Sequence, residues 1–546
     1  MRYLSENKRE DMRMKKRTAA RSMAALMGAA MVLTACGGGN TTAPTTGASS
    51  GGETQTASES AESGKITKTD IVVGQASDIV TLDPAGQQDT TSGVLMKHAY
   101  STLLDVDNEG KVVPDLAESY EMKSDTEYVF KLREDACFWD GTPVTAQDVK
   151  FSLDRAKGMP KTKSNTSKIE EVTVNGDHEV TIKLTEPYAA FKTIVTQHNL
   201  SILSEKAVTE AGDSYGDVDN LLGSGPFKVT EWVPNDHYTL VRNDNYWGEM
   251  PIATSITCRV IPEGSARTIA LEAGEIDVVW SVDPTDCANV ESNPDVKLLS
   301  QPSTGIDYVG MNTQKEKFSD KRVRQAINYA LDKQTFVDTI IEGRGLVANS
   351  YINAAIPGWT DEVEAYPYDP EKAKELLAEA GYPDGFECSI FVNGDLRTRS
   401  AQILQAQLAD VGIKVDISTY EWGALLDTLN AGEHEMFLLG WSNTSFDPDG
   451  STYQLFYSGN HGATGNRAFF SNDKVDELIL SAQRESEESK RMELYKELQF
   501  VLHDESPWCP LYYKENNVGV RADLKPVIRE SRVKKVLVDG GSSINV

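Results

Sequence analysis

The sequence predicts an α/β fold, and the hydrophobic period along the chain is the main reason. Short alternating segments typical of strands dominate residues 66–310, whereas a helical period dominates from residue 315 on. Strands and helices then alternate regularly between residues 387 and 440. A chain of 546 residues has room for three or four folding units of ordinary size.

The strand-rich part contains two clear hairpin signals. Residues 172–184 alternate apolar and polar side chains around Asn175-Gly176, a dipeptide that favours a tight turn. Residues 227–241 give a second alternating pair. A helix interrupts these strands, because Thr145 and Asp148 form a capping-box pattern before the amphipathic residues 149–157.

The helix-rich part begins with a predicted helix that Ser319 or Asp320 caps and that runs through Ile341. A second helix starts after Asp369, with proline at its first position, and stops at Gly381. The regular alternation follows, with strands at 387–393, 413–419 and 435–440 and helices at 398–411 and 422–429. This order predicts a parallel sheet with right-handed crossovers. Helices near 473–484 and 487–503 and a strand-like segment at 508–520 complete the chain.

The parallel unit predicts where a ligand binds, because open α/β sheets bind ligands beyond the carboxyl ends of their strands. The segments after its three strands carry Arg397 and Arg399, then Tyr420 and Trp422, then Trp441 and Asp447. Guanidinium and carboxylate groups suit a zwitterion, and indole faces suit apolar or cationic groups. The alternative is that the two tryptophans are core residues and the charges are solvated loop residues.

Composition excludes several classes of protein. The chain has 54 Lys and Arg against 83 Asp and Glu, a net charge of -29, which disfavours nucleic acid and anionic lipid as partners. After residue 40 there is no apolar run of 18 residues, which excludes a polytopic membrane protein. The cysteines at 137, 258, 287, 388 and 509 are scattered without a C-x-x-C pair. They are expected to be buried small hydrophobes, with one disulfide possible and no metal cluster.

The N-terminus has the form of a targeting segment. Eight Lys or Arg lie within residues 1–35, and a short apolar run from Met23 to Ala35 follows all of them. The run ends in Leu33-Thr34-Ala35-Cys36, which resembles the lipobox of bacterial lipoproteins. Residues 1–35 are therefore expected to be a signal peptide and Cys36 a lipidation site. Residues 36–65, rich in Gly, Ser and Thr, are expected to form a flexible tether.

Catalytic patterns in the chain lack the context that chemistry requires. Ser214 lies in a G-x-S-x-G sequence, but an irregular or amphipathic segment rather than a buried strand precedes it. Ser471 and Lys474 fit S-x-x-K, yet the pattern reads as a helix cap. The seven histidines are dispersed, and Glu433-His434-Glu435 is expected to be an exposed loop. The sequence thus predicts no catalytic residue, no metal site and no cofactor.

Several long stretches carry a resemblance to a known family. These include LAESYEMKSDTEYVFKLREDACFWDGTPVTAQDVKFSLDR at 116–155, GSGPFKVTEWVPNDHYTLVRNDNYWG at 223–248, DKRVRQAINYALDK at 320–333 and YEWGALLDTLNAGEHEMFLLGW at 420–441. From about residue 66 to the end, the chain resembles the extracytoplasmic solute-binding proteins of ABC importers, in the peptide- and nickel-binding family.

The resemblance implies a periplasmic-binding-protein-like fold, with two hinged α/β lobes, an additional lobe and a ligand enclosed in the cleft. On this chain, lobe I corresponds to 66–103, 223–313 and 506–546, lobe II to 104–222 and lobe III to 314–505. In peptide-binding relatives an Asp after the Gly-Trp pair holds the peptide ammonium, and Thr444 occupies that position here. The resemblance therefore suggests Asp447 as a substitute, Arg399 rather than Arg397 for the peptide carboxylate, and Trp441 as a pocket residue.

The resulting hypothesis is an extracytoplasmic lipoprotein that binds short peptides and delivers them, by hinge closure, to an ABC permease with its ATPase subunits. It would act as a monomer and contact the membrane only through its lipid anchor. Within the same class, the cargo could instead be a nickel chelate, haem or an oligosaccharide. An extracellular hydrolase is the alternative from a different class.

Overall fold

The structure is a computed structural model that describes residues 68–87, 89–107, 111–443, 445–462 and 465–524. All of these residues belong to one compact unit, Lys65–Val546. The predicted signal peptide, Cys36, the tether and Thr444 lie outside the described residues. None of the described helices is both long and apolar enough to cross a membrane.

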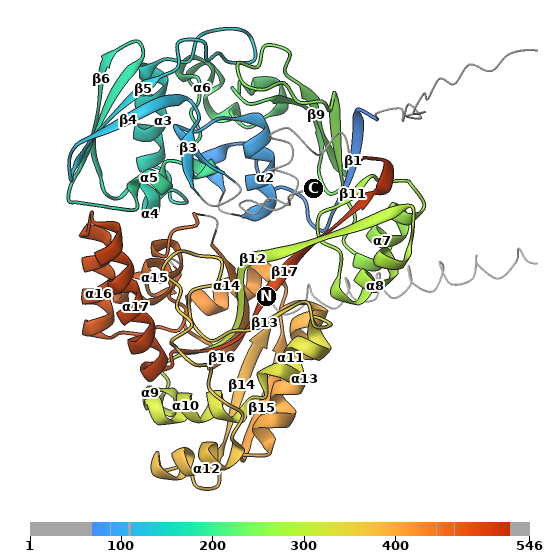
Figure 1. The fold of residues 1–546 in the computed structure, drawn as a ribbon, viewed down its shortest axis with the longest axis vertical. Coiled ribbons are helices and arrows are strands. Elements are labelled where there is room, and N and C mark those ends of the chain that lie inside the picture. Colours follow the sequence, from blue (N-terminus) through green and yellow to red (C-terminus); the bar gives the residue numbers. More distant parts are fainter. Residues whose placement is uncertain (1–67, 88, 108–110, 444, 463–464, 525–546) are drawn as a thin grey trace, which may run out of the picture. The chain divides into compact units, whose positions relative to one another are not determined.

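One sheet of eleven strands organises this unit (Figure 1), in the order β15-β14-β16-β12-β17-β11-β1-β10-β9-β8, with β13 paired to β17. The strands of this sheet are β1 (Asp70–Gln75), β8 (Phe227–Val233), β9 (His237–Arg242), β10 (Ser255–Val260), β11 (Val278–Val279), β12 (Val296–Met311), β13 (Gly345–Val347), β14 (Phe386–Val392), β15 (Ile413–Thr419), β16 (Met436–Ser442) and β17 (Trp508–Arg521).

The two longest strands, β12 and β17, connect the two halves of this sheet. They pair antiparallel from Val296 opposite Arg521 to Gly310 opposite Trp508. At one end Val296 packs in a core with Ile276, whereas at the other end Val309 packs in a separate core with Leu404. In Figure 1 the pair runs from the side of β1 and β11 to the side of β14 and β16. Both halves therefore share the same two strands.

The predicted β-α-β-α-β unit is confirmed on one side of this pair. β14 pairs parallel with β15, where Phe386 lies opposite Ile413, and with β16, where Phe391 lies opposite Phe437. The connecting helices are α13 (Gly394–Ala409) and α14 (Trp422–Asn430). The spacing of apolar residues predicted these elements correctly, because the residues that it placed inside are buried in one core: Ile390, Val392, Leu404 and Leu408.

A separate antiparallel sheet, in the order β4-β5-β7-β6, comes from the segment between β1 and β8. Its strands, with the nearby pair β2 and β3, are β2 (Leu104–Val106), β3 (Val112–Pro114), β4 (Ala117–Ser124), β5 (Glu127–Leu132), β6 (Ile169–Gly176) and β7 (Glu179–Leu184). The predicted hairpin at 172–184 is the β6–β7 pair. Phe130 and Val180 form its core with Leu153 of a covering helix, whose Thr145–Asp148 capping box is present as predicted.

The remaining helices lie around these sheets. They are α2 (Thr90–Ala99), α3 (Ala146–Lys157), α4 (Lys163–Thr166), α5 (Phe191–Ile194), α6 (Glu205–Ala211), α7 (Gly264–Glu272), α8 (Pro284–Ser292), α9 (Glu316–Ser319), α10 (Lys321–Ala330), α11 (Lys333–Ile340), α12 (Pro370–Glu379), α15 (Asp449–Phe456), α16 (Asp473–Arg484) and α17 (Glu488–Glu505). These elements confirm the α/β class, while the proposed lobe boundaries stay a prediction.

The predicted single helix from Asp320 to Ile341 is wrong, because the structure breaks it into α10 and α11. Asp320 caps α10 as expected, by accepting a hydrogen bond from the Arg322 backbone N–H. Asp332 then caps a new helix by accepting from the Gln334 backbone N–H. An Asp inside an apolar period is a strong start signal for a new helix, and it overrides the continuous helical pattern here.

Arg324, within the DKRVRQAINYALDK stretch, fastens α10 to the end of α17. Its buried guanidinium donates to the carbonyls of Phe318 and Ser319 at 2.8 and 2.9 Å. It also donates to the Glu505 carbonyl at 2.6 and 3.0 Å. That carbonyl belongs to the last turn of α17, so Arg324 satisfies an acceptor that the helix itself cannot.

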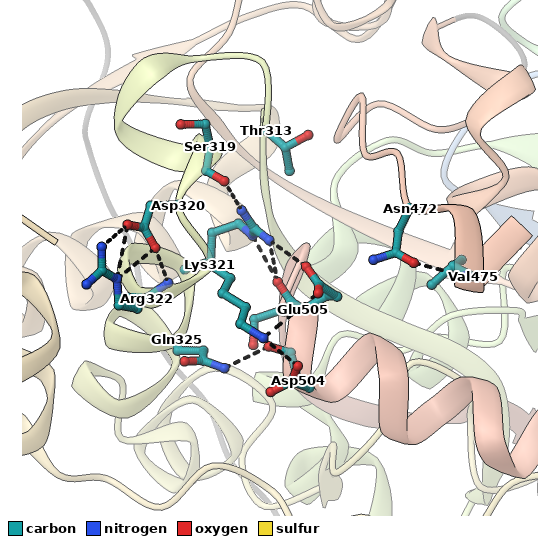
Figure 2. Close-up of polar contacts among 12 residues, drawn as sticks. Thr313, Ser319, Asp320, Lys321, Arg322, Gln325, Asn472, Val475, Asp504 and Glu505 are labelled. Carbon is teal, nitrogen blue, oxygen red and sulfur yellow. Dashed lines mark hydrogen bonds and ion pairs between the residues drawn. The ribbon is translucent and has the colours of Figure 1, made fainter.

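Exposed neighbours of Arg324 make a second set of contacts that Figure 2 shows. Lys321 binds the Asp504 carboxylate at 2.6 Å, and the Gln325 amide donates to the Asp504 carbonyl at 2.7 Å. Arg322 instead turns back to Asp320 at 2.6 Å, on its own helix. Arg324 and Arg322 therefore lie two residues apart but make contacts of very different burial.

Replacing Arg324 with Met should lower the free energy of unfolding by about 2–3 kcal/mol, because three carbonyls lose a buried charged donor. Arg322→Met is the matched control and should lower stability less, because its ion pair with Asp320 and its hydrogen bond to the Glu379 carbonyl lie at the surface. Urea unfolding followed by circular dichroism measures both variants. Equal losses in the two would show that Arg324 has no special role in holding α17.

Candidate functional site

A cavity of about 490 Å³ opens where the two halves of the large sheet meet. One set of lining residues follows β1 and β11, namely Gln75, Ala76, Ser77 and 280–284, together with the start of α2. A second set follows β14 and β16, namely 393–397 and Ser442. The third set, Asp307, Tyr512 and 514–517, belongs to β12 and β17. The cavity is therefore bounded by both halves and by the strands that connect them.

The location agrees with the rule for open α/β sheets on both sides. β1 pairs parallel with β10 and β11, and its carboxyl end at Gln75 reaches the cavity. β14 and β16 are also parallel, and their carboxyl ends reach the cavity through Asn393 and Ser442. Ligands bind at such strand ends because loops there leave an open crevice.

Seven charged side chains line this cavity, and three of them lie close together. Asp307 is 4% exposed, and one of its oxygens lies 3.3 Å from Lys514 Nζ. The other oxygen lies 3.9 Å from Arg397 Nη2. Asp307 comes from β12, Lys514 from β17 and Arg397 from the first turn of α13. We call these three residues the charge cluster; it carries two positive charges and one negative charge.

The backbone around Asp307 is irregular, and this irregularity makes room for the cluster. The β12–β17 register shifts between Pro302 and Ile306 and again between Asp307 and Tyr308. Such bulges redirect side chains and are common beside functional sites. On the other neighbouring strand, Gly440 lies opposite Asp307, and a Cβ there would come within 3.1 Å of its carboxylate.

Polar atoms of the cavity lack hydrogen-bond partners. Arg397 Nε and Trp280 Nε1 are buried and have no hydrogen-bond partner within the described part of the chain, while Asp307 Oδ2 has an ion pair with Lys514 Nζ at 3.3 Å but no hydrogen bond there. Buried polar groups in folded proteins are nearly always paired, so the unpaired atoms at this cavity indicate a place for a polar ligand. The arrangement can bind a zwitterion, since both signs of charge are present.

Among the predicted site residues, Arg397 lines this cavity and Arg399 does not. Arg399 lines an adjoining cavity of about 510 Å³ together with Asp283, Thr285 and Thr398. Burial raises the pKa of Asp283, and the nearby guanidiniums of Arg267 and Arg399 oppose that rise. Arg399 thus faces a carboxylate from the other half of the sheet, while Arg397 faces Asp307.

Asp447 lies in a different environment from the one that an ammonium anchor needs. Its two carboxylate oxygens accept hydrogen bonds from Arg491 at 2.9 and 2.5 Å, and both side chains are buried. One of these oxygens also accepts the Asp449 backbone N–H at 2.9 Å. The structure therefore gives Asp447 a full set of partners from α17 and α15, and leaves Thr444 outside the described residues.

The predicted aromatic residues are positioned apart from the cavity lining. Trp441 is half-buried and donates its indole N–H to the Gly450 carbonyl at 3.2 Å, while its ring packs against Ile306 and Ala348. Tyr420 packs on Phe391 with ring centroids 4.9 Å apart. Trp422 begins α14 with 49% of its surface exposed. For Trp441 the alternative of a packing residue therefore describes the structure better.

Sequence reasoning missed Asp307, Lys514, Trp280 and the loops of the first half. One signal was available for Asp307: it is a single charge inside the apolar run Gly305-Ile-Asp-Tyr-Val-Gly-Met311. A charge at such a position is disfavoured unless it is paired or functional. β12 pairs with residues of β17 that lie about 200 positions later in the chain, and such a distant contact leaves no pattern in the local sequence.

Other patterns named in the sequence resolve as local structure. Helix α6 precedes Ser214, so this serine lacks the strand that a nucleophile elbow requires. The expectation that 433–435 is an exposed loop is wrong for His434, which is fully buried and whose pKa burial lowers to about 4. The five described cysteines are free, and all but Cys137 are buried. No group of three potential metal ligands occurs among the described residues.

Asp447→Asn should lower the free energy of unfolding by about 3–5 kcal/mol, because it leaves the buried Arg491 guanidinium without its counter-ion. Asp410→Asn, an exposed carboxylate at the far end of α13, is the control and should melt like the wild type. Thermal unfolding compares the two. A variant that keeps wild-type stability but loses ligand affinity would instead support an anchoring role for Asp447.

Comparison with known proteins places the chain in a family. The family model described as bacterial extracellular solute-binding proteins, family 5 Middle, matches residues 111–463. The chain is 32% identical over 461 residues to the glutathione-binding protein GsiB of Shigella boydii serotype 4, covering 81% of this chain and 88% of that protein.

Solved structures give the same result. The periplasmic binding protein DppA from Helicobacter pylori, in complex with the peptide STSA, matches with a TM-score of 0.77 and 29% identity, covering 83% of this chain and 94% of that one. The oligopeptide-binding protein AppA from Bacillus subtilis, in complex with a nonapeptide, matches with a TM-score of 0.73 and 26% identity, covering 83% and 94%. The predicted periplasmic-binding-protein-like fold is confirmed, and these relatives are binding proteins rather than enzymes. The chain therefore belongs to family 5 of the bacterial extracellular solute-binding proteins, which serve ABC importers.

Proposed function

We propose that this protein captures short peptides outside the cytoplasm and delivers them to an ABC permease with its ATPase subunits. The observation that carries the proposal is the cavity at the meeting of the two sheet halves, with charges of both signs and buried Arg397 Nε and Trp280 Nε1 atoms that have no hydrogen-bond partner among the described residues. A cavity of about 490 Å³ is of the size that encloses small ligands. Peptide cargo is supported by the relatives that bind glutathione, the peptide STSA and a nonapeptide.

The charged lining favours a zwitterion over a neutral oligosaccharide or haem. An oligosaccharide offers no charges to the ion-paired Asp307, Arg397 and Lys514, and haem would bring a large apolar surface against them. A short peptide supplies an ammonium, a carboxylate and backbone amides in one small molecule. It can therefore satisfy the polar atoms of the cavity.

Hinge closure is the proposed mechanism of capture. Residues 280–284 contact a ligand from one half of the sheet, and 393–397 contact it from the other. A ligand that binds both halves stabilises the closed state by the free energy of those shared contacts. β12 and β17 are the strands about which the halves would move, and their register shifts lie beside the cavity. The permease would then recognise the closed form.

Protein purified without denaturation should release a peptide of a few residues, identifiable by mass spectrometry after acid extraction. The same peptide, added back at 100 times its dissociation constant, should raise the free energy of unfolding by about 2.7 kcal/mol and should not be hydrolysed. Small-angle scattering should show compaction on binding. Release of haem or sugar, or hydrolysis of the peptide, would reject the proposed function.

Lipid anchoring through Cys36 is the proposed means of retention at the membrane. Cys36→Ser should release the full chain into the soluble extracytoplasmic fraction, because acylation of that thiol is the proposed attachment. Cell fractionation with a carbonate wash measures the distribution, with Cys137→Ser as a control that should stay membrane-bound. A Cys36→Ser protein that stays with the membrane after the wash would exclude this anchor.

A further inference from the structure

We infer that residues 186–189 form a closing contact, which binds helices α15 and α16 when the two halves of the large sheet close and thereby slows the release of cargo that it does not touch. The inference rests on the proposed function, because it assumes capture by hinge closure. It makes Tyr188 and Glu186 positioning residues for capture rather than ligand-binding residues.

Hydrogen bonds between buried groups form the centre of this contact. The Tyr188 hydroxyl donates to Asp449 Oδ2 at 2.8 Å, and the Ala189 backbone N–H donates to the Gln483 carbonyl at 2.7 Å. The Gln483 side-chain amide donates to Asp449 Oδ1 at 2.8 Å. Each oxygen of the buried Asp449 carboxylate therefore accepts a hydrogen bond, one of them from across the contact.

An ion pair lies at the edge of the contact. Arg484 Nη2 lies 3.0 Å from Glu186 Oε2, and Lys168 binds the other oxygen of Glu186. Arg484 belongs to the last turn of α16, whereas Glu186 and Lys168 flank the β6–β7 hairpin. Because Arg484 and Glu186 are partly exposed, exchanging their charges should alter the contact without disturbing a core.

The two sides of the contact belong to different halves of the structure. Residues 186–189 follow β7, and the four-stranded sheet that contains β7 is packed on the first half, where Trp139 shares a core with Val73 of β1. Helices α15 to α17 follow β16, and Leu455 shares a core with Leu439 of that strand. A movement of one half against the other about β12 and β17 would therefore separate the two sides.

No apolar core joins the two sides within the described part of the chain. Tyr188 packs with Phe191 in the core of the four-stranded sheet, whereas Leu478 of α16 packs in the core beside β16. A contact built from hydrogen bonds and an ion pair can separate without exposing a large apolar surface, as polar contacts between moving domains do. The contact is thus suited to form and break repeatedly.

The Asp449 carboxylate makes the hydrogen bond from Tyr188 a strong one. Burial, together with the neighbouring Asp447 carboxylate, raises the pKa of Asp449 to about 6, and the hydrogen bonds from Tyr188 and Gln483 oppose that rise. At neutral pH the carboxylate is therefore mostly ionised, and a hydrogen bond to an ionised group contributes more than one between neutral groups. When the halves open, water takes the place of the Tyr188 hydroxyl.

The residues of the closing contact do not line the ligand cavity. They can change affinity only through the equilibrium between the open and closed forms. A contact that exists only in the closed form raises the population of that form, and the apparent dissociation constant falls in proportion. The contact therefore acts by the same factor on every cargo that the closed form holds.

Tyr188→Phe tests the contact, because it removes the hydroxyl and keeps the ring in its core. The probe is the compound that acid extraction releases from the wild-type protein, added to the ligand-free full chain. Stopped-flow tryptophan fluorescence should show dissociation about 10-fold faster, with the association rate within about twofold of wild type. Tyr128→Phe, which removes a hydroxyl of β5 from the same core, is the matched control and should keep both rates.

A charge exchange tests the ion pair separately. Arg484→Glu sets two carboxylates against each other and should speed dissociation by about threefold or more. Adding Glu186→Arg to Arg484→Glu restores opposite charges and should slow dissociation again, towards the wild-type rate. The ligand-free melting temperature of each variant should stay near that of the wild type, because the contact forms on closing and not on folding.

An unchanged dissociation rate in Tyr188→Phe would overturn the inference while leaving capture intact, and a lower ligand-free melting temperature beside it would identify a fixed structural contact. A double exchange that dissociates as fast as Arg484→Glu would remove Glu186 from the contact. If the extracted compound is not a peptide, the proposed cargo fails, whereas the same rates still test the closing contact with that compound. If scattering shows no compaction of the wild type on binding, hinge closure and this inference fail together.

Discussion

The antiparallel pairing of β12 with β17 is the interaction on which the rest of the structure depends. These strands are the only connection through which the described large sheet passes from the β14–β16 side to the β1–β11 side. Because each strand contributes residues to a core at both of its ends, neither half can be completed without them. The strand ends that form the cavity come from opposite halves, and this one pair brings them together.

The irregular backbone of the site also lies in this pair of strands. A regular ladder would place every residue of β12 opposite a partner, but the register shifts on both sides of residues 306 and 307 interrupt it. Asp307 then occupies a position where an apolar side chain would stabilise the strand more. Glycines at 305 and 440 remove the side chains that would otherwise fill this space. The register shifts of this pair and the buried charge coincide at the cavity, as expected when function rather than stability selects a residue.

The sequence predicted the elements whose residues repeat with a regular period, and failed where a contact joins distant segments. β15 lies at 413–419 as predicted, because its alternation is bounded by Gly412 and by polar residues. The break between α10 and α11 was missed, because the helical period continues across Asp332 while the cap is a single residue. At the site, the sequence analysis named both arginines and preferred Arg399, whereas the structure places Arg397 at this cavity and Arg399 at the adjoining one. That ranking depends on which guanidinium faces Asp307, a contact with a residue 90 positions earlier in the chain.

Two buried carboxylates show how partners distant in the sequence determine the environment of a charge. Asp447 follows a strand end in a loop with Pro448, which is the pattern expected of a binding residue, but Arg491 lies 44 residues away and satisfies it completely. Asp307 lies inside a strand, the pattern expected of a core position, yet it lines the cavity and its charged partners Lys514 and Arg397 lie 3.3 and 3.9 Å away. Both are about equally buried, so burial does not distinguish them. What distinguishes them is pairing: the short bidentate pair of Asp447 with Arg491 holds the fold together, whereas the longer contacts of Asp307 at a cavity make it the better candidate for a ligand contact.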